Sequence, residues 1–129
     1  MPSKVKSRAG CRNKGASGER EAAKAIMTNC PGIAAERNAR NGKQCSDVLV
    51  WMRDSSDPPR LLEVKRVESL DIGTKAMAKI REQATADGAI GVLWRRNRST
   101  WRLDCQWYGS WVTFSGPDVW KQIERLVSQ

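Results

Sequence analysis

Two short apolar segments, residues 47–52 and 60–66, flank a turn-forming stretch rich in Asp, Ser and Pro. Apolar runs of this length on either side of such a turn predict two strands joined as a β-hairpin. Side chains at positions i and i+2 of a strand lie on the same face. We therefore expect Glu63 and Lys65 to share one face of the second strand, while the residues that alternate with them pack into a core.

The rest of the chain predicts helices and further strands around this hairpin. The expected elements are a helix at about 17–29, a strand at 33–38, a helix at 73–87, strands at 89–95 and 100–108, and a helix at 117–128. The order α-β-β-β-α-β-β-α predicts an α/β fold with a central mixed β-sheet flanked by α-helices. At 129 residues the chain has room for one domain, which we expect at residues 14–129 after a flexible basic arm at residues 1–13.

The composition excludes several classes of protein. The chain has no histidine, which excludes Ser-His and Cys-His nucleophilic machinery, and no glycine-rich phosphate loop. Its four cysteines include no Cys-x-x-Cys pair, so we do not expect a zinc site. No apolar run approaches the roughly 18 residues of a membrane span, and the first residues lack the apolar stretch of a signal peptide. We therefore expect a cytoplasmic protein with no membrane attachment and no small-molecule cofactor.

The positive charge is concentrated in the first third of the chain. The formal net charge is +9, and residues 1–43 carry ten Lys or Arg against three Asp or Glu. An excess of this size favours a polyanionic partner such as nucleic acid. A membrane surface is a weaker alternative because the basic arm lacks an apolar face. For residues 1–13 taken alone, a solvated basic tail is an equal alternative.

Asp47, Glu63 and Lys65 form a candidate catalytic group. Two carboxylates on adjacent strands can share one hard divalent cation such as Mg²⁺, with the backbone carbonyl of Val64 as a third oxygen ligand. Such an ion neutralises phosphate charge and acidifies a water, and Lys65 can orient that water or stabilise the developing negative charge. A simple surface ion pair between Glu63 and Lys65 is the alternative interpretation.

Glu19 adds a third carboxylate. It lies three and four residues before Ala22 and Ala23, on or beside the apolar stripe of the first predicted helix. A carboxylate on the inward side costs free energy unless something binds it. Its alternative role is an interaction with the helix N-terminus, worth about 0.3–1 kcal/mol. We expect Glu19 beside the metal site, directly or through water, and Glu21 projecting away from the stripe.

The order of these residues resembles the PD-(D/E)XK nuclease superfamily. The resemblance is carried by residues 14–21 (KGASGERE), Arg37, Arg40, residues 46–48 and residues 62–65, within about residues 12–95. In order and spacing these residues are most similar to the archaeal-type Holliday junction resolvases, including those carried by bacteriophages. The resemblance implies a restriction-endonuclease-like core and a homodimer that nicks four-way DNA junctions symmetrically with Mg²⁺ or Mn²⁺. By this likeness, the catalytic positions are those of Glu19, Asp47, Glu63 and Lys65.

Two accessory residues come from the same resemblance. Ser46 stands where a proline often precedes the motif aspartate, and the preceding loop differs from the glycine- and serine-rich loop of the resolvases. Ser46 is the accessory candidate for the serine that assists cleavage in those enzymes. Gln83, expected on the inward side of the second helix, matches a glutamine often found after the core motif. Ordinary helix packing is its equal alternative.

Basic residues around the carboxylates are candidate DNA contacts. They are Arg12, Lys14, Arg20, Arg37, Arg40, Lys43 and Arg66. Phosphate contacts of this kind give affinity with steep salt dependence and little base specificity. The sequence therefore predicts a metal-dependent endonuclease that resolves four-way DNA junctions by paired nicks. Another structure-selective or repair nuclease on the same core, or a non-catalytic DNA-binding module, are the alternatives.

Six tryptophans stand against one tyrosine and one phenylalanine. We expect core and strand packing for Trp51, Trp94 and Trp120. Another three, Trp101, Trp107 and Trp111, fall in an arginine-containing stretch. Tryptophan is enriched at protein interfaces and also stacks on bases, so this stretch predicts either a subunit interface or, less directly, a base-stacking surface.

Overall fold

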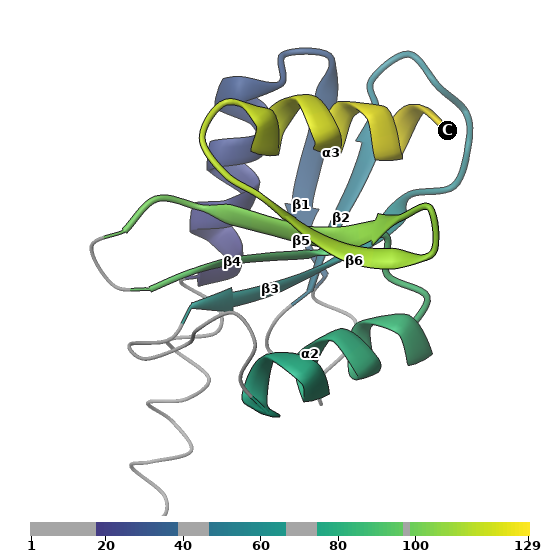
Figure 1. The fold of residues 1–129 in the computed structure, drawn as a ribbon. Coiled ribbons are helices and arrows are strands. Elements are labelled where there is room, and N and C mark those ends of the chain that lie inside the picture. The colour runs from purple at the N-terminus through teal and green to yellow at the C-terminus, as the bar shows by residue number, and fades with distance from the viewer. Residues whose placement is uncertain (1–17, 39–46, 67–74, 97–98) are drawn as a thin grey trace, which may run out of the picture.

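The computed structural model describes residues 18–38, 47–66, 75–96 and 99–129. These residues form a six-stranded mixed sheet with helices on both faces (Figure 1). The N-terminal helix is described over residues 18–29. The other elements are β1 (Ile33–Arg37), β2 (Asp47–Met52), β3 (Arg60–Arg66), α2 (Lys75–Ala86), β4 (Val92–Arg95), β5 (Arg102–Trp107), β6 (Ser110–Phe114) and α3 (Asp118–Ser128). The expectation of an α/β fold built on a mixed sheet is confirmed.

The strands lie side by side in their sequence order, from β1 to β6. Every neighbouring pair is antiparallel except β3 and β4, which are parallel. A parallel pair needs a crossover connection, and α2 lies in that connection. As a result, β1, β3 and β4 end at one edge of the sheet, where β2 and β5 begin. We call this edge the site edge.

The two faces of the sheet have different cover. The N-terminal helix and α3 pack on one face, over a core that includes Val48, Leu62 and Val64 (Figure 1). Helix α2 packs on the other face through a smaller cluster of Met77, Ala84, Val92 and Trp94. Leu62 and Val64 are 0% and 3% exposed, as the alternation in the sequence predicted. The residues that alternate with them therefore lie on the α2 face.

One strand was not predicted. Residues 110–114 form β6, which pairs with β5 through a two-residue turn at Tyr108 and Gly109. Both turn residues have positive φ, 51° and 84°, as a primed hairpin turn requires. Such turns are usually marked by Asn-Gly or Asp-Gly, and a tyrosine in the first position hides the signal. The expected strand at 100–108 is therefore a hairpin in the structure.

Other boundaries lie close to the expected ones. β3 has the predicted bounds, β4 begins at Val92 instead of Ala89, and Gly88 follows α2 with a φ of 73°. The expected basic arm at residues 1–13 lies outside the described residues. No helix in the described ranges has both the length and the apolar character that crossing a bilayer requires.

Candidate active site

Asp47 and Glu63 face each other across β2 and β3. Asp47 begins β2, Glu63 lies in the middle of β3, and the antiparallel register pairs them directly. Direct cross-strand partners have Cβ atoms about 4.5–5.5 Å apart and side chains on one face. The two residues are 2% and 1% exposed. The fold thus brings two acidic groups together inside the protein, near the site edge and on the α2 face.

Lys65 places an ammonium group next to this pair. It follows Glu63 by two positions on β3, so its side chain leaves the sheet on the same face. Its Nζ lies 3.8 Å from Oε1 of Glu63, and its side chain is 32% exposed. Lys65 therefore contacts the buried carboxylate and still reaches the surface, where it can meet a phosphate group.

Glu19 brings a third buried carboxylate from the N-terminal helix. It is 1% exposed, and its Oε2 lies 3.6 Å from Nε of Arg37, at the end of β1. Burial raises the pKa of Glu19 to about 7, against the lowering effect of Arg37, and the Asp47 carboxylate raises it further. The side chain points into the protein, as the helical stripe predicted, and lies within electrostatic range of Asp47.

These carboxylates include buried oxygens that accept no hydrogen bond from the described residues. Within the described parts of the chain, both oxygens of Glu19 and Oδ1 of Asp47 are buried with no hydrogen bond. A buried acceptor in this state costs about 1–3 kcal/mol, and more when it is charged. Such groups are rare in native folds and mark functional positions or the site of a water or an ion.

The donor set fits a hard divalent cation. Mg²⁺ takes oxygen ligands and is usually held by one or two carboxylates together with several waters. Asp47 and Glu63 supply two carboxylates side by side, and Val64 supplies the next backbone carbonyl along β3. In the described ranges, no three acidic or cysteine side chains converge closely enough to form a metal site on their own. The described residues thus supply two adjacent carboxylates, with Glu19 within electrostatic range of Asp47.

Asp104 is a buried residue whose two carboxylate oxygens both accept hydrogen bonds from the protein. It lies in β5 with 0% exposure. Its Oδ2 accepts from Nε of Arg81 at 2.8 Å, and its Oδ1 accepts from Nε1 of Trp94 at 2.9 Å and from Oγ1 of Thr113 at 2.8 Å. These donors come from α2, β4 and β6. Asp104 therefore ties α2 to the sheet.

The sequence analysis missed Asp104, although its neighbours offered a signal. Leu103 and Cys105 flank it on the strand and are buried on one face, while Asp104 points to the other face, which α2 covers. The comparison with Asp47 is informative because Val92 links both residues into one cross-strand row, through Glu63. Within this row both oxygens of Asp104 accept hydrogen bonds, whereas Oδ1 of Asp47 accepts none from the described residues.

The candidate DNA contacts divide into two groups. Arg20 is exposed on the N-terminal helix, Arg37 pairs with Glu19, and Arg66 pairs with Glu21. The others, together with the accessory serine, lie outside the described residues: Arg12, Lys14, Arg40, Lys43 and Ser46.

Gln83 does not lie on the inward side of α2, so that expectation is wrong. Its side chain is exposed, and its Nε2 donates to Oδ1 of Asp87 at 3.0 Å. The buried residues of the helix are Met77 and Ala84. They are seven positions apart, which defines a narrow apolar stripe, and Gln83 lies about 100° around the helix from Ala84.

The tryptophans lie mostly within the protein's own packing. Trp94 is 1% exposed, whereas Trp51 and Trp120 are half-buried. Arginine groups lie over three more half-buried rings, in the pairs Arg95–Trp101 (5.2 Å), Arg125–Trp107 (4.7 Å) and Arg81–Trp111 (5.4 Å). Such contacts are worth about 0.5–1 kcal/mol at exposed sites. A role of these rings in a subunit interface or in base stacking stays a prediction.

The comparisons with known proteins show a similarity among solved structures. No protein-family model matches the chain, and no curated protein matches it significantly. Among solved structures, the chain is similar to Hjc of Archaeoglobus fulgidus, described as a Holliday junction resolvase from an archaeal hyperthermophile. The sequence identity is 20% and the TM-score 0.45, over 90% of this chain and 97% of that chain. At this level of similarity, the roles of individual residues depend on the geometry of this chain.

Proposed function

We propose that the chain is a divalent-metal-dependent endonuclease that cleaves DNA phosphodiesters. Its proposed active site is formed by Asp47, Glu63 and Lys65. The observation that carries the proposal is the direct pairing of two buried acidic residues, with an ammonium group 3.8 Å from one of them. Like charges directly opposite each other destabilise a sheet. A bound cation offsets this repulsion, and it also explains why the buried Oδ1 of Asp47 receives no hydrogen bond among the described residues.

In the proposed reaction, a water oxygen bonds to phosphorus and one P–O ester bond breaks. Asp47 and Glu63 would hold the ion through their carboxylate oxygens, with the Val64 carbonyl beside them. When bound, the ion supplies positive charge against the phosphate oxygens and makes a water easier to deprotonate. Lys65 donates hydrogen bonds from Nζ to the attacking water or to a phosphate oxygen, which stabilises the developing negative charge. The departing oxygen takes up a proton, which balances the proton lost by the water.

Glu19 and Arg37 complete the site on the side of the N-terminal helix. Glu19 would accept a hydrogen bond from a water that lies between it and Asp47, which satisfies one of its two buried oxygens. Arg37 keeps its guanidinium 3.6 Å from Glu19 and so limits the charge repulsion between the carboxylates. Glu19 thus acts as a positioning residue in the proposal.

Branched DNA is the proposed substrate, with the four-way junction first. The net charge of +9 supports a polyanionic partner. The resemblance of the sequence motifs to archaeal-type resolvases supports the junction among DNA forms. Two symmetric nicks need two active sites, so a homodimer is part of the proposal, as is the use of Mg²⁺ or Mn²⁺.

A panel of labelled DNA substrates tests this proposal. Wild type and Asp47→Asn are incubated with four-way, flap, linear duplex and single-stranded DNA, with Mg²⁺, with Mn²⁺ and with EDTA. We expect metal-dependent paired nicks, placed symmetrically across the junction, with wild type only. Cleavage of flaps or duplex in preference to junctions would indicate a different nuclease on the same site. Binding without cleavage of any substrate would indicate a DNA-binding module.

A further inference from the structure

A pair of arginines lies beside the candidate active site, on the opposite face of the sheet. Arg66 ends β3, Arg95 ends β4, and the parallel register makes them direct partners. Because Lys65 leaves β3 on the α2 face, Arg66 leaves it on the face of the N-terminal helix. Two guanidinium groups placed side by side repel each other, so this arrangement needs a negative group between them.

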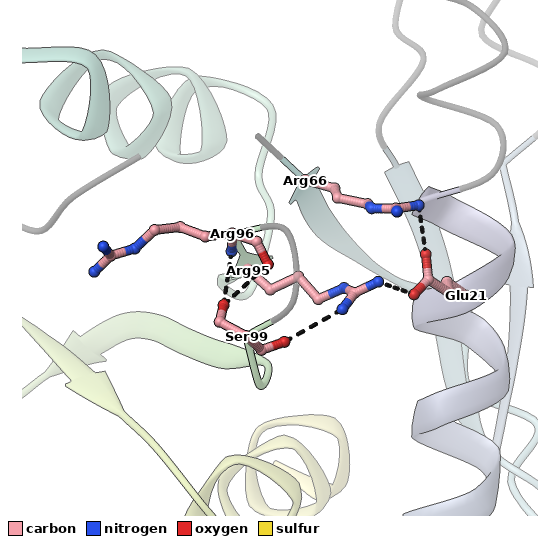
Figure 2. A network of polar contacts seen from close by, with 5 residues as sticks. All are labelled: Glu21, Arg66, Arg95, Arg96 and Ser99. Carbon is pink, nitrogen blue, oxygen red and sulfur yellow. Dashed lines mark hydrogen bonds and ion pairs between the residues drawn. The ribbon is translucent and has the colours of Figure 1, made fainter. Parts of the chain in front are cut away.

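Glu21 is that group. It comes from the N-terminal helix, and its Oε2 accepts from Nη1 of Arg66 at 2.8 Å. Its Oε1 accepts from Nη2 of Arg95, so a single carboxylate bridges the two strands (Figure 2). Glu21 lies two residues after Glu19, on a different side of the same helix turn. One turn of helix therefore serves both the buried acidic site and this pair of arginines.

Arg95 is the fixed member of the pair. Its guanidinium lies 5.2 Å from the centre of the Trp101 ring, and its Nη1 donates to the Ser99 carbonyl at 3.2 Å. Ser99 is itself held, because its amide donates to the Arg96 carbonyl at 3.1 Å and its Oγ accepts from the Arg96 amide at 3.0 Å (Figure 2). The Arg95 side chain is 16% exposed. Arg95 is thus bound on three sides and is poorly placed to reach a ligand.

Arg66 is the accessible member. Its side chain is 34% exposed, and the contact that the described residues give its guanidinium is the one from Nη1 to Glu21. A guanidinium has five N–H groups, so the described residues leave several of them for a ligand. Its fork matches the oxygens of a phosphate better than an ammonium does. Arg66 also follows Lys65 directly, so it lies at the same edge of the sheet as the proposed cleavage position, with its side chain on the other face.

We propose that Glu21 is a positioning residue that holds Arg66 for contact with a DNA phosphate next to the cleaved one, with Arg95 and Trp101 as its brace. The identity of the ligand rests on the proposed function, whereas the positioning concerns binding and not cleavage. Trp101 stabilises Arg95, Arg95 fixes Glu21, and Glu21 orients Arg66. The negative charge of Glu21 therefore strengthens DNA binding, although charge repulsion alone would weaken it.

Charge repulsion alone predicts that Glu21→Gln tightens DNA binding, whereas the positioning role predicts that it weakens binding. Glu21→Gln is therefore the decisive variant. The dissociation constant of a labelled four-way junction is measured in EDTA over a series of salt concentrations, so that no cleavage occurs. We expect Glu21→Gln to weaken binding about tenfold, because the loss of one hydrogen bond to a charged group typically has an effect of this size. Arg66→Gln is expected to weaken it by a similar factor and to lower the salt slope by about 0.9. The double variant is expected to bind like Arg66→Gln alone.

The matched control is Asp57→Asn, which removes one negative charge from the β2–β3 turn at the opposite edge of the sheet. Asp57 is exposed there. By removing charge alone, it is expected to leave binding unchanged or slightly tighter. Circular dichroism and thermal unfolding compare the folding of all variants. If Glu21→Gln does not fold, Trp101→Leu tests the brace, and we expect weaker binding in the wild-type background and no further loss in Arg66→Gln.

Several results would overturn the inference. One is that Glu21→Gln binds the junction as tightly as wild type or more tightly. Another is that Glu21→Gln weakens binding by the same factor in the Arg66→Gln background as in wild type. The third is that wild type does not bind DNA. Binding and cleavage are measured separately, so the failure of one proposal can be told from the failure of the other. If the binding series behaves as expected but no substrate is cleaved with any metal, the endonuclease proposal fails and the phosphate contact is retained.

Discussion

Glu63 pairs with the acidic Asp47 of β2 on one side and with the apolar Val92 of β4 on the other, so the three residues form one cross-strand row. The row continues to Asp104, whose hydrogen bonds are complete. At the Asp47 end of the row, by contrast, the buried Oδ1 accepts no hydrogen bond from the described residues.

Replacing either paired carboxylate by its amide keeps the shape and removes the charge. We expect Asp47→Asn and Glu63→Gln each to lower the cleavage rate on the order of 10²-fold or more, because the ion loses a charged ligand. Junction binding is expected to persist or to tighten, since the phosphate is repelled less. Single-turnover cleavage and binding in EDTA measure the two effects. Asp57→Asn is the control with the same loss of charge, and wild-type rates in both site variants would place the active site elsewhere.

A divalent cation is expected to stabilise the folded protein. An ion that binds only the folded state at ten times its dissociation constant raises the free energy of unfolding by about 1.4 kcal/mol. We expect Mg²⁺ or Mn²⁺ to raise the midpoint of thermal unfolding of wild type and to leave that of Asp47→Asn unchanged. Equal shifts in the two proteins would show that the ions bind at another position.

Lys65→Ala is expected to separate rate from affinity. The ammonium contacts Glu63 and reaches the surface, so its loss removes stabilisation of the developing charge. We expect a fall in the cleavage rate on the order of 10²–10³-fold with junction binding retained within a few-fold. Lys79→Ala, on an exposed position of α2, is the matched control. A variant that lost affinity alone would make Lys65 a phosphate contact without a part in the reaction.

Glu19 is expected to make stability depend on pH. Its pKa is about 7 in the folded protein, above the ordinary value of 4.5, so the folded state holds more protons between these values. The free energy of unfolding should therefore fall as pH rises from about 4.5 to about 7, by at most about 1.4 kcal/mol per pH unit from this group. Below that range its contribution is complete, and above it there is no further change.

Urea unfolding in metal-free buffer, repeated at pH intervals of roughly half a unit between about pH 4 and pH 8, measures this slope. Glu19→Gln lacks the titrating group, so the difference between wild type and variant should change only inside the window. A pH-independent difference between the two proteins would contradict the assignment.

Asp104→Ala is expected to destabilise the fold without touching the site. The change leaves the partly buried Arg81 guanidinium without its carboxylate, which costs about 3–5 kcal/mol for a buried pair. Asp57→Ala, on the surface, is expected to change stability by less than about 0.5 kcal/mol. Urea unfolding compares the two variants. Similar losses would mean that the buried network contributes little to holding α2.

The sequence predicted the elements that carry strong local signals. β3 follows a Pro-Pro turn and alternates apolar with charged residues, so its bounds and its two faces agree with the prediction. Because Asp47 and Glu63 lie on either side of this turn, their approach could be expected from the hairpin. The buried position of Glu19 followed from the helical stripe, because residues three and four positions apart lie on the same side of a helix and Ala22 and Ala23 are buried.

Features that depend on distant segments could not be predicted in this way. The hydrogen bonds of Asp104 come from three other elements, so nothing near it in sequence announces them. The solvent-facing position of Gln83 depends on how α2 is rotated against the sheet, and that rotation is set by Met77 and Ala84. The bridge from Glu21 to Arg66 and Arg95 joins residues up to 74 positions apart.

The parallel pairing of β3 with β4 has a consequence for how the site assembles. The proposed acidic residues and Lys65 all come from residues 18–66, where β1, β2 and β3 pair as neighbours in sequence. Joining β4 to β3 closes a longer loop through α2 and costs more chain entropy, and contacts of that kind slow folding. A chain in which only the first half has formed would carry the acidic cluster without Arg95 and Trp101, and so without the support for Arg66.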